Sequence, residues 1–321
     1  MPETLKQQIV TKDSETNPRI EHEIALTMLV SIVWKKKILV IFITLLFSLA
    51  SIFYAVNEPN IYKSEALLTP VEAESASGLS ALAGQFGGLA SLAGVNLGGG
   101  SNKSQLAVEV IKSRKFTSGF ISKHNILKEL MAVKNWDPSS NKLIYDEDIY
   151  DEKSGEWVRN VSFPLNKKPS LQEAYKAFED VVSVKTDKET GLVTISVVHV
   201  SPFIAQQWVN WLVEDINQEM KERDVVEANR STEFLTKQLE VTNIADIRSV
   251  LYKLIEEQAK TIMFANVRDE YVFNTIDPAL APEQKNGPKR ALIVIIFTLL
   301  GGVIGSLIVI FNYYRKTEKN N

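Results

Sequence analysis

Two long apolar segments near the two ends of the chain dominate its hydropathy pattern. The first covers residues 38–56 and the second covers residues 291–311, and neither contains a charged residue. At 1.5 Å of rise per residue, each would form a helix of roughly 28–31 Å, about the thickness of the hydrocarbon core of a bilayer. Core helices of soluble proteins are the alternative, but their apolar runs are usually shorter. The pattern therefore predicts two transmembrane helices that bracket one central domain, residues 57–290.

Basic residues beside the first apolar segment predict the orientation of the chain. Trp34-Lys35-Lys36-Lys37 precedes this segment, and Asn57-Glu58-Pro59 follows it. Because positive charge favours the cytoplasmic side, we expect residues 1–37 and 312–321 to be cytoplasmic tails and the central domain to face outward. One observation disagrees, since basic residues also flank the second segment on its outer side. Long loops are translocated largely regardless of their charge, so we take the orientation of the chain from the lysines before the first segment. The disagreeing residues are Lys285, Lys289 and Arg290.

The central domain mixes strand and helix patterns, which predicts an α+β fold. Ser170 with Glu173 predicts a capping box for a short helix, and Ser201-Pro202 predicts the start of a long one. That helix would extend for about 60 Å, since its next break signal is Thr242-Asn243. Its middle is almost wholly polar, so it projects into solvent or packs on copies of itself. The strands are expected at 61–71, 181–186, 192–200 and 271–276, and the helices at 103–131, 171–180 and 202–266 with one interruption.

Two segments of the central domain are less clear. Residues 142–159 predict a β-hairpin that pairs Leu143-Ile144-Tyr145 with Trp157-Val158 and turns near Gly155. Residues 75–100 are rich in glycine, alanine and serine, which is typical of a flexible loop. Apolar residues in this segment nevertheless recur every three or four positions, which predicts an amphipathic element against a neighbouring subunit or the membrane surface. These residues are Leu79, Leu82, Phe86, Leu89 and Leu92.

Composition excludes several classes of function. The net charge of −3 and the isoelectric point near 5.8 argue against a nucleic-acid-binding protein, which would carry a basic face. With no cysteine, the chain has no disulfide, thiolate metal site or cysteine nucleophile. Its three histidines, His22, His124 and His199, lie in unrelated contexts and indicate neither a metal site nor a catalytic triad.

The remaining candidate sites for metals and nucleotides also fail. The acidic residues between Asp146 and Glu152 lack the alternating ligands and fixed glycine of a calcium loop, so we expect a solvated hairpin end. Residues 98–104 are similar to a phosphate-binding loop, but Leu97 and Asn102 stand where the pattern requires glycine. We therefore expect no catalytic residue, no cofactor, no metal and no nucleotide.

Small residues in both apolar segments predict close helix packing. Gly301 and Gly305 form a small-xxx-small pair in the second segment, and Ser51 and Ala55 are similarly placed in the first. The contact would lie within one chain or between subunits. Three prolines before the second segment predict a stiff, extended link between the domain and the membrane, because proline fixes φ and resists helix and sheet. They are Pro278, Pro282 and Pro288.

A set of motifs, taken in their order along the chain, resembles the polysaccharide co-polymerases, the Wzz-type chain-length determinants of bacterial surface polysaccharides. The resemblance covers nearly the full length. It departs at Pro288, which follows a five-residue spacer and makes the proline motif slightly loose, and residues 78–100 cannot be assigned. The motifs are the two apolar segments, Ser201-Pro202-x-x-Ala205 with Trp208-Val209-Asn210-Trp211-Leu212, Leu251-Tyr252-x-Leu254-Ile255-Glu256-Glu257-Gln258, Ala265-Asn266-Val267-Arg268-Asp269-Glu270-Tyr271, Asp277-Pro278-Ala279-x-x-Pro282 and Pro288-Lys289-Arg290.

The resemblance implies a periplasmic α+β domain with a membrane-proximal α/β base and a long projecting helical hairpin, anchored by two transmembrane helices. It also implies ring-like homo-oligomers in the bacterial inner membrane, without catalytic residues. Such proteins set the modal length of a polymer, typically the O-antigen of lipopolysaccharide, with a separate membrane polymerase. The expected partners are copies of the chain, that polymerase or the lipid-linked glycan, and the bilayer. The polar helix face with Arg223, Glu227 and Arg230 is the candidate contact surface.

Other functions remain open from the sequence alone. The protein could regulate or export another surface polysaccharide, such as a common antigen, a capsule or an exopolysaccharide. A membrane sensor or adaptor would need a cytoplasmic output domain, for which the tails are too short. A glycan-processing enzyme would need a pair of carboxylates, and no pair stands out. The sequence does not name the polysaccharide, its modal length, the number of subunits or the contact residues.

Overall fold

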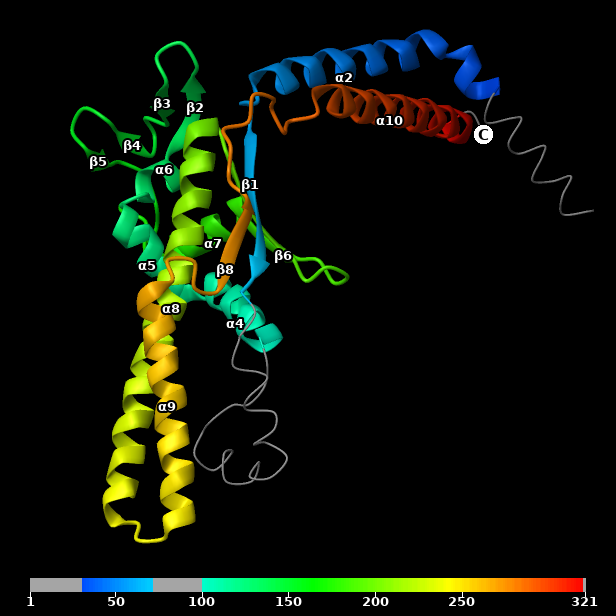
Figure 1. Ribbon diagram of the computed structural model, residues 1–321. Helices are drawn as coiled ribbons and strands as arrows, with labels where there is room; N and C mark the ends of the chain where they lie inside the picture. The colour runs from blue at the N-terminus through cyan, green and yellow to red at the C-terminus, as the bar shows by residue number, and fades with distance from the viewer. Residues whose placement is uncertain (1–30, 72–99, 320–321) are drawn as a thin grey trace, which may run out of the picture. The chain divides into compact units, whose positions relative to one another are not determined.

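The computed structural model describes residues 31–71 and 100–319 and divides into two compact units (Figure 1). One unit contains Met1–Glu58 and Lys289–Asn321, and the other contains Pro59–Pro288. His22 and most of the segment 75–100, including the predicted amphipathic element, lie outside the described residues.

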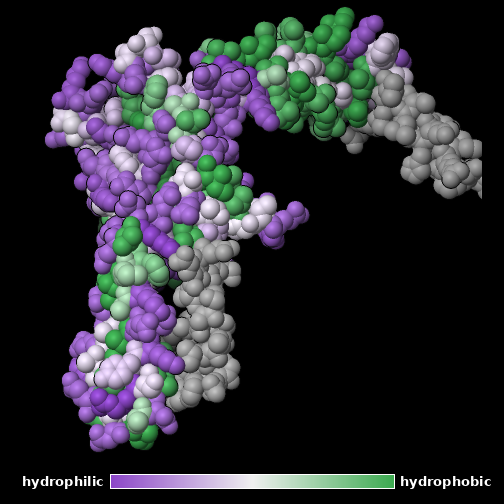
Figure 2. All heavy atoms as spheres, viewed as in Figure 1, coloured by the Kyte–Doolittle hydropathy of each residue, from purple (hydrophilic) through white to green (hydrophobic). Residues whose placement is uncertain are grey.

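The first unit consists of two apolar helices that pack antiparallel. They are α2 (Lys37–Asn57) and α10 (Arg290–Lys319), and both are long and apolar enough to cross a membrane. Partner positions run in opposite directions, because Tyr54 meets Phe297 while Val40 meets Gly305. Apolar side chains cover the visible face of the pair (Figure 2). Among the described residues, these are the helices expected for a two-pass membrane protein.

The second unit is built on a four-stranded antiparallel sheet. The strands lie side by side in the order β6 (Val182–Thr186), β7 (Val193–His199), β1 (Tyr62–Pro70) and β8 (Phe273–Asp277). The first central pairing aligns Tyr62 with His199 and Leu68 with Val193. All four strands were predicted from the sequence, and β8 returns the chain beside β1 from far along the sequence.

A layer of helices covers one face of this sheet and encloses the core. The core helix is α8 (Pro202–Val241), whose residues Trp208, Leu212 and Ile216 are fully buried. Against them lie Leu68, Ile195, Val197 and Phe273 from the strands. The remaining cover comes from α4 (Gly100–Lys112), α5 (Arg114–His124), α6 (Leu127–Met131) and α7 (Leu171–Val181). The expectation of a mixed α+β domain is therefore confirmed.

Two predicted elements differ in the structure. The periodic stretch 103–131 forms three helices rather than one, because Ser113 leaves the helical conformation and caps α5 by accepting a hydrogen bond from Phe116 N. The predicted hairpin pairing within 142–159 is wrong. Strand β3 (Lys142–Tyr145) pairs with β2 (Val133–Asp137), which precedes this segment. The hairpin that forms within the segment is shorter and pairs β4 (Tyr150–Asp151) with β5 (Glu156–Trp157). The segment 137–140, Asp-Pro-Ser-Ser, is the turn between β2 and β3.

The long helix and its partner form the predicted helical hairpin. The helix α8 has 40 residues, and α9 (Ala245–Val267) has 23. The interruption lies at 242–244, as the sequence predicts, although Ser201 and Asn243 do not cap the helices with their side chains. Beyond the sheet, α8 packs along α9 and buries Ala228 and Leu235 (Figure 1). This second packing partner explains how α8 remains a helix through its polar middle.

The capping box at the start of α7 is confirmed. Ser170 Oγ accepts a hydrogen bond from Glu173 N, and Glu173 Oε1 accepts one from Ser170 N. The same carboxylate accepts two hydrogen bonds from Arg159, one from Nη1 at 2.6 Å and one from Nη2 at 3.0 Å. The Arg159 hydrogen bond, supported by the Ser170 N–H, lowers the pKa of Glu173 to about 2. The box therefore also ties the loop that carries Arg159 to the helix.

Glu173→Gln is expected to destabilise the central unit by about 1–2 kcal/mol at pH 7, because a charged acceptor of three N–H groups becomes neutral. A carboxylate with a lowered pKa stabilises the fold above about pH 4.5 and loses that effect as the pH falls towards 2. The variant should therefore lose less stability than the wild type between pH 5 and 2. Denaturant unfolding followed by circular dichroism measures this. Asp180→Asn, at an exposed carboxylate of the same helix, is the control, and an identical acid response in Glu173→Gln would contradict the prediction.

Candidate functional site

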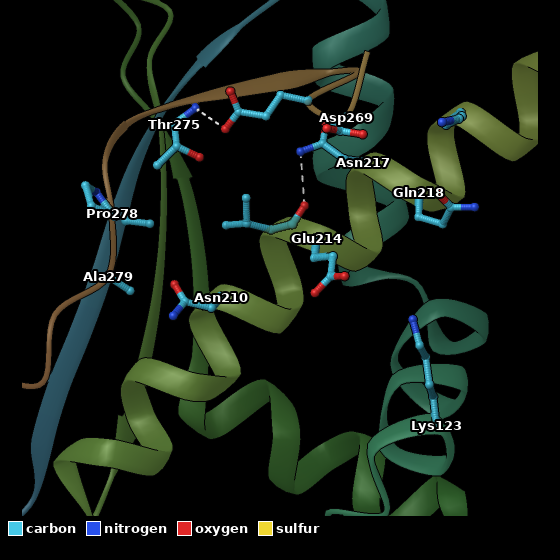
Figure 3. Close-up of a pocket in the computed structure, with 13 residues that line it drawn as sticks. Lys123, Asn210, Glu214, Asn217, Gln218, Asp269, Thr275, Pro278 and Ala279 are labelled. Atoms are coloured by element: carbon cyan, nitrogen blue, oxygen red, sulfur yellow. Dashed lines mark hydrogen bonds between the residues drawn. The ribbon is translucent and has the colours of Figure 1, made fainter. Parts of the chain in front are cut away.

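A groove in the central unit lies between α8 and the segment that contains β8 (Figure 3). Its volume is about 510 Å³, which is within the usual range for ligand sites. Polar and charged side chains dominate the lining, and four small apolar residues complete it. The lining residues are Ala66, Lys123, Asn210, Val213, Glu214, Asn217, Gln218, Lys221, Asp269, Glu270, Thr275, Pro278 and Ala279.

One helix supplies both the core and one wall of the groove. Positions three or four apart share a helix face, so Asn210, Glu214 and Gln218 form one stripe along α8. The buried stripe with Trp208 and Leu212 lies on another face of the same turns. The core packing that orders α8 therefore also fixes the polar stripe, and Figure 3 shows Asn210 and Glu214 on this helix across from Pro278 and Ala279.

Asn217 joins α8 to the other wall. Its side chain is 4% exposed, and its Oδ1 accepts hydrogen bonds from Val272 N at 2.8 Å and from Phe273 N at 3.0 Å. Its Nδ2 donates to Phe273 O at 3.1 Å and to Val213 O at 3.1 Å. The amide thus satisfies three backbone groups at the start of β8, which would otherwise be buried without partners. These hydrogen bonds hold the α8 wall and the β8 wall in a fixed position relative to each other.

Further bonds fix the rest of that wall. Glu270 Oε1 accepts from Thr275 N at 2.9 Å, and Gln206 Nε2 donates to Ala279 O at 2.9 Å. Beyond the groove, Ser64 Oγ donates to Leu280 O at 2.7 Å. Pro278, predicted as part of a stiff link, is therefore in a segment bonded to α8 and β1. Pro282 and Pro288 follow it, and Gly287 O accepts a hydrogen bond from Ile61 N at 3.0 Å. The mechanical role of the three prolines stays a prediction.

A buried acid lies beside the groove. Asp215 accepts hydrogen bonds from Lys123 Nζ at 2.6 Å and pairs with His124 Nε2 at 2.9 Å. The imidazole of His124 stacks on Trp211 with ring centroids 4.1 Å apart. The Asp215 hydrogen bond raises the pKa of Lys123 above its ordinary value. The cluster fastens the end of α5 to α8, and the sequence does not reveal it because its members are about 90 residues apart.

Several groove residues are not used by the fold. Within the described part of the chain, the side chains of Asn210, Glu214, Lys221 and Asp269 make no hydrogen bond or salt bridge, and the charge of Glu214 acts on Lys123 only at longer range. They present a carboxamide, two carboxylates and an ammonium group to the groove. By contrast, Asn217 and Glu270 are committed to the backbone, as shown above. The described residues contain no group of three or more potential metal ligands. Such a groove can bind a polar ligand through hydrogen bonds.

The predicted contact face of α8 lies beyond the groove. Arg223, Glu227 and Arg230 are exposed there. The structure contains one chain, so the assignment of these residues to a partner stays a prediction. The acidic segment 146–152 consists of tight turns in which Asp146 and Asp151 accept hydrogen bonds from backbone N–H groups two residues ahead.

The small residues of both apolar helices are buried within the first unit. Ser51 and Ala55 are buried in α2, and Gly301 and Gly305 are buried in α10. A Cβ atom on Gly301 would lie 2.7 Å from Phe47 Cβ, whereas one on Gly305 would lie 3.4 Å from Val40. The glycines thus lie at a crossing within one chain, and their role in packing between subunits stays a prediction.

Comparison with known proteins supports the resemblance found in the sequence. Residues 22–124 match the family model described as chain length determinant protein, Wzz. The chain is thereby confirmed to resemble the Wzz-type polysaccharide co-polymerases. No curated protein matches the chain.

Two solved structures are similar to the chain. A full-length bacterial polysaccharide co-polymerase is 12% identical with a TM-score of 0.40, covering 90% of this chain and 97% of that one. A fragment of WzzB, a polysaccharide co-polymerase from Salmonella Typhimurium, is 12% identical with a TM-score of 0.32, covering 71% of this chain and 100% of that one.

Proposed function

We propose that this protein regulates the chain length of a bacterial surface polysaccharide, most specifically the O-antigen of lipopolysaccharide, without catalysing a reaction itself. The match of residues 22–124 to the chain length determinant family carries the proposal. That segment includes the first apolar helix, strand β1 and helices α4 and α5, so it joins the membrane anchor to the base of the central unit.

The proposed location is the bacterial inner membrane, with two membrane-spanning helices, both tails in the cytoplasm and the central unit in the periplasm. The cluster Lys35-Lys36-Lys37 supports this topology. Several copies of the chain would assemble into a homo-oligomer through the apolar helices, the base and the helical hairpin. This scaffold would hold the membrane polymerase or the lipid-linked glycan, and so set how far the polymer grows before release.

The helical hairpin of the central unit supports a scaffold. The hairpin of α8 and α9 presents a long surface with exposed charged residues such as Glu227 and Arg230. Long helices with such surfaces suit contact with other subunits or polymer.

A strain that lacks this gene tests the function. We expect its surface polysaccharide to remain abundant but to lose the preferred length, because synthesis continues without the regulator. A gel of surface polysaccharide from the deletion strain, with and without the restored gene, measures the distribution. Loss of all polymer would contradict the proposal and favour a synthase or transporter. If the ladder of a capsule, common antigen or exopolysaccharide changes instead of the O-antigen, that polymer is the one regulated.

A further inference from the structure

We infer that the groove between α8 and the β8 segment binds a short run of sugar residues of the polymer that this protein regulates. The inference rests on the proposed function, because it identifies the glycan rather than the polymerase as the direct ligand. It depends on the side chains that the fold leaves free, on the shape of the groove and on the rigidity of its walls.

The free side chains suit hydroxyl groups. Asn210 offers both a donor and an acceptor, Glu214 and Asp269 offer acceptors, and Lys221 offers donors. A sugar ring carries neighbouring hydroxyls that donate and accept at once, so each of these groups finds a partner on it. The lining contains two lysines and three carboxylates, and this near balance selects neither a strong anion nor a strong cation. A polyhydroxylated ligand is the class that fits.

The groove is elongated along α8. From Asn210 to Lys221 the helix advances by about 17 Å, since each of the eleven steps adds 1.5 Å. Figure 3 shows Asn210, Glu214 and Gln218 in succession along this helix, with Lys123 reaching in from α5. An extended oligosaccharide of a few rings matches this length, whereas a single small metabolite would use only part of it.

The walls are fixed before any ligand arrives. Asn217 holds the start of β8, and Gln206 holds Ala279, so the two sides cannot separate without breaking one buried and one partly buried hydrogen bond. The end of α5 is held by Asp215 through Lys123 and His124. Preformed walls reduce the entropy cost of binding, which matters for a ligand that forms weak hydrogen bonds in competition with water.

A second copy of the chain is the alternative occupant. The cores of protein–protein interfaces are enriched in aromatic residues, methionine and arginine. The groove lining contains none of these, and its apolar members are the small residues Ala66, Val213, Pro278 and Ala279. A polar lining with small apolar patches therefore favours a glycan over a protein, and the experiment below distinguishes the two.

The test uses the full chain in detergent and the delipidated surface polysaccharide of the same strain, hydrolysed to short oligosaccharides. Isothermal titration calorimetry compares the wild type with Asn210→Ala, Glu214→Gln and the double variant. We expect a loss of affinity of a few fold for each single variant and of at least tenfold for the double variant. Gln207→Ala is the matched control, because Gln207 is an exposed amide on the same helix outside the groove. Dextran is the control glycan and should bind more weakly.

Two outcomes would overturn the inference. One is an unchanged affinity in the double variant, and the other is a change in oligomer mass without a change in affinity, which would make the groove a contact between subunits. Polymer gels separate this failure from that of the proposed function. If deletion of the gene leaves the length distribution unaltered, the function fails. If deletion broadens the distribution but the double variant keeps both the wild-type ladder and affinity, only the groove is refuted.

Discussion

Replacing Gly301 by leucine is expected to force the two apolar helices apart. Even a methyl group at this position would lie 2.7 Å from Phe47 Cβ and 3.3 Å from Thr44 Cα, so the backbone of α2 must move. Overpacking of this kind costs about 1–3 kcal/mol, and a leucine adds three more carbons to the clash. In a bilayer, close backbone approach is a main source of helix association, so the loss is not offset by hydrophobic burial.

The absence of cysteine makes this contact measurable. Tyr54→Cys with Phe297→Cys places two thiols at a point where the native rings are 6.5 Å apart, in a chain with no other thiol. A short bifunctional thiol reagent should join them efficiently in membrane vesicles with Gly301 present. We expect Gly301→Leu to lose most of this cross-link, and Gly301→Ala to lose part of it.

Two neighbouring glycines provide graded controls. At Gly302 the added Cβ would meet only Thr44 Oγ1 at 3.7 Å, so Gly302→Ala should cross-link as the wild type does. At Gly305 the nearest atoms are those of Val40 at 3.4 Å, which is an ordinary contact, so Gly305→Ala should have a small effect and Gly305→Leu an intermediate one. An efficient cross-link in Gly301→Leu would show that the helices do not depend on this crossing.

Much of the local structure was predictable because its signals are local. The capping box depends on Ser170 and Glu173, three residues apart, and the start of α8 depends on Pro202. The β-branched residues of β7 and the uninterrupted length of α8 are likewise local signals. These elements appear in the structure within one or two residues of the predicted bounds.

The failures concern which elements pair. Periodicity identified a strand at 142–145, but its partner was wrong, since the chain turns at 137–140 and pairs β3 with β2. A turn of the sequence Asp-Pro-Ser-Ser can end a helix or join two strands, and nothing local decides between them. Ser113 presented the same problem, because an N-cap serine within a continuous apolar pattern is easily taken for a surface residue.

The groove was not predictable for a similar reason. Asn210, Glu214 and Gln218 have the spacing of any solvated helix face, and the second wall comes from a segment more than 50 residues later. What turns this face into a groove is the return of β8 to the edge of the sheet. No local signal distinguishes Asn217 from its polar neighbours, although it is the residue on which that return depends.

Asn217→Ala is therefore expected to have the largest effect on the central unit. The change removes the acceptor for Val272 N and Phe273 N and the donor to Phe273 O, which leaves three backbone groups without partners. A buried group without a partner costs about 1–3 kcal/mol, and water entering from the adjacent groove would recover part of this. We expect a net loss of about 2–4 kcal/mol and a loosened start of β8.

Hydrogen exchange measured by mass spectrometry locates the effect. Peptides that contain residues 272 and 273 should lose protection in Asn217→Ala, while those from β6 and β7 on the opposite side of the sheet should change little. Gln218→Ala, an exposed amide on the same turn whose side chain bonds to Glu222 rather than to β8, controls for loss of an amide from α8. If the exchange of 272 and 273 is unaltered, β8 is held by its pairing with β1 alone. The walls of the groove would then be independent of α8, and the preformed shape on which glycan binding depends would lack its support.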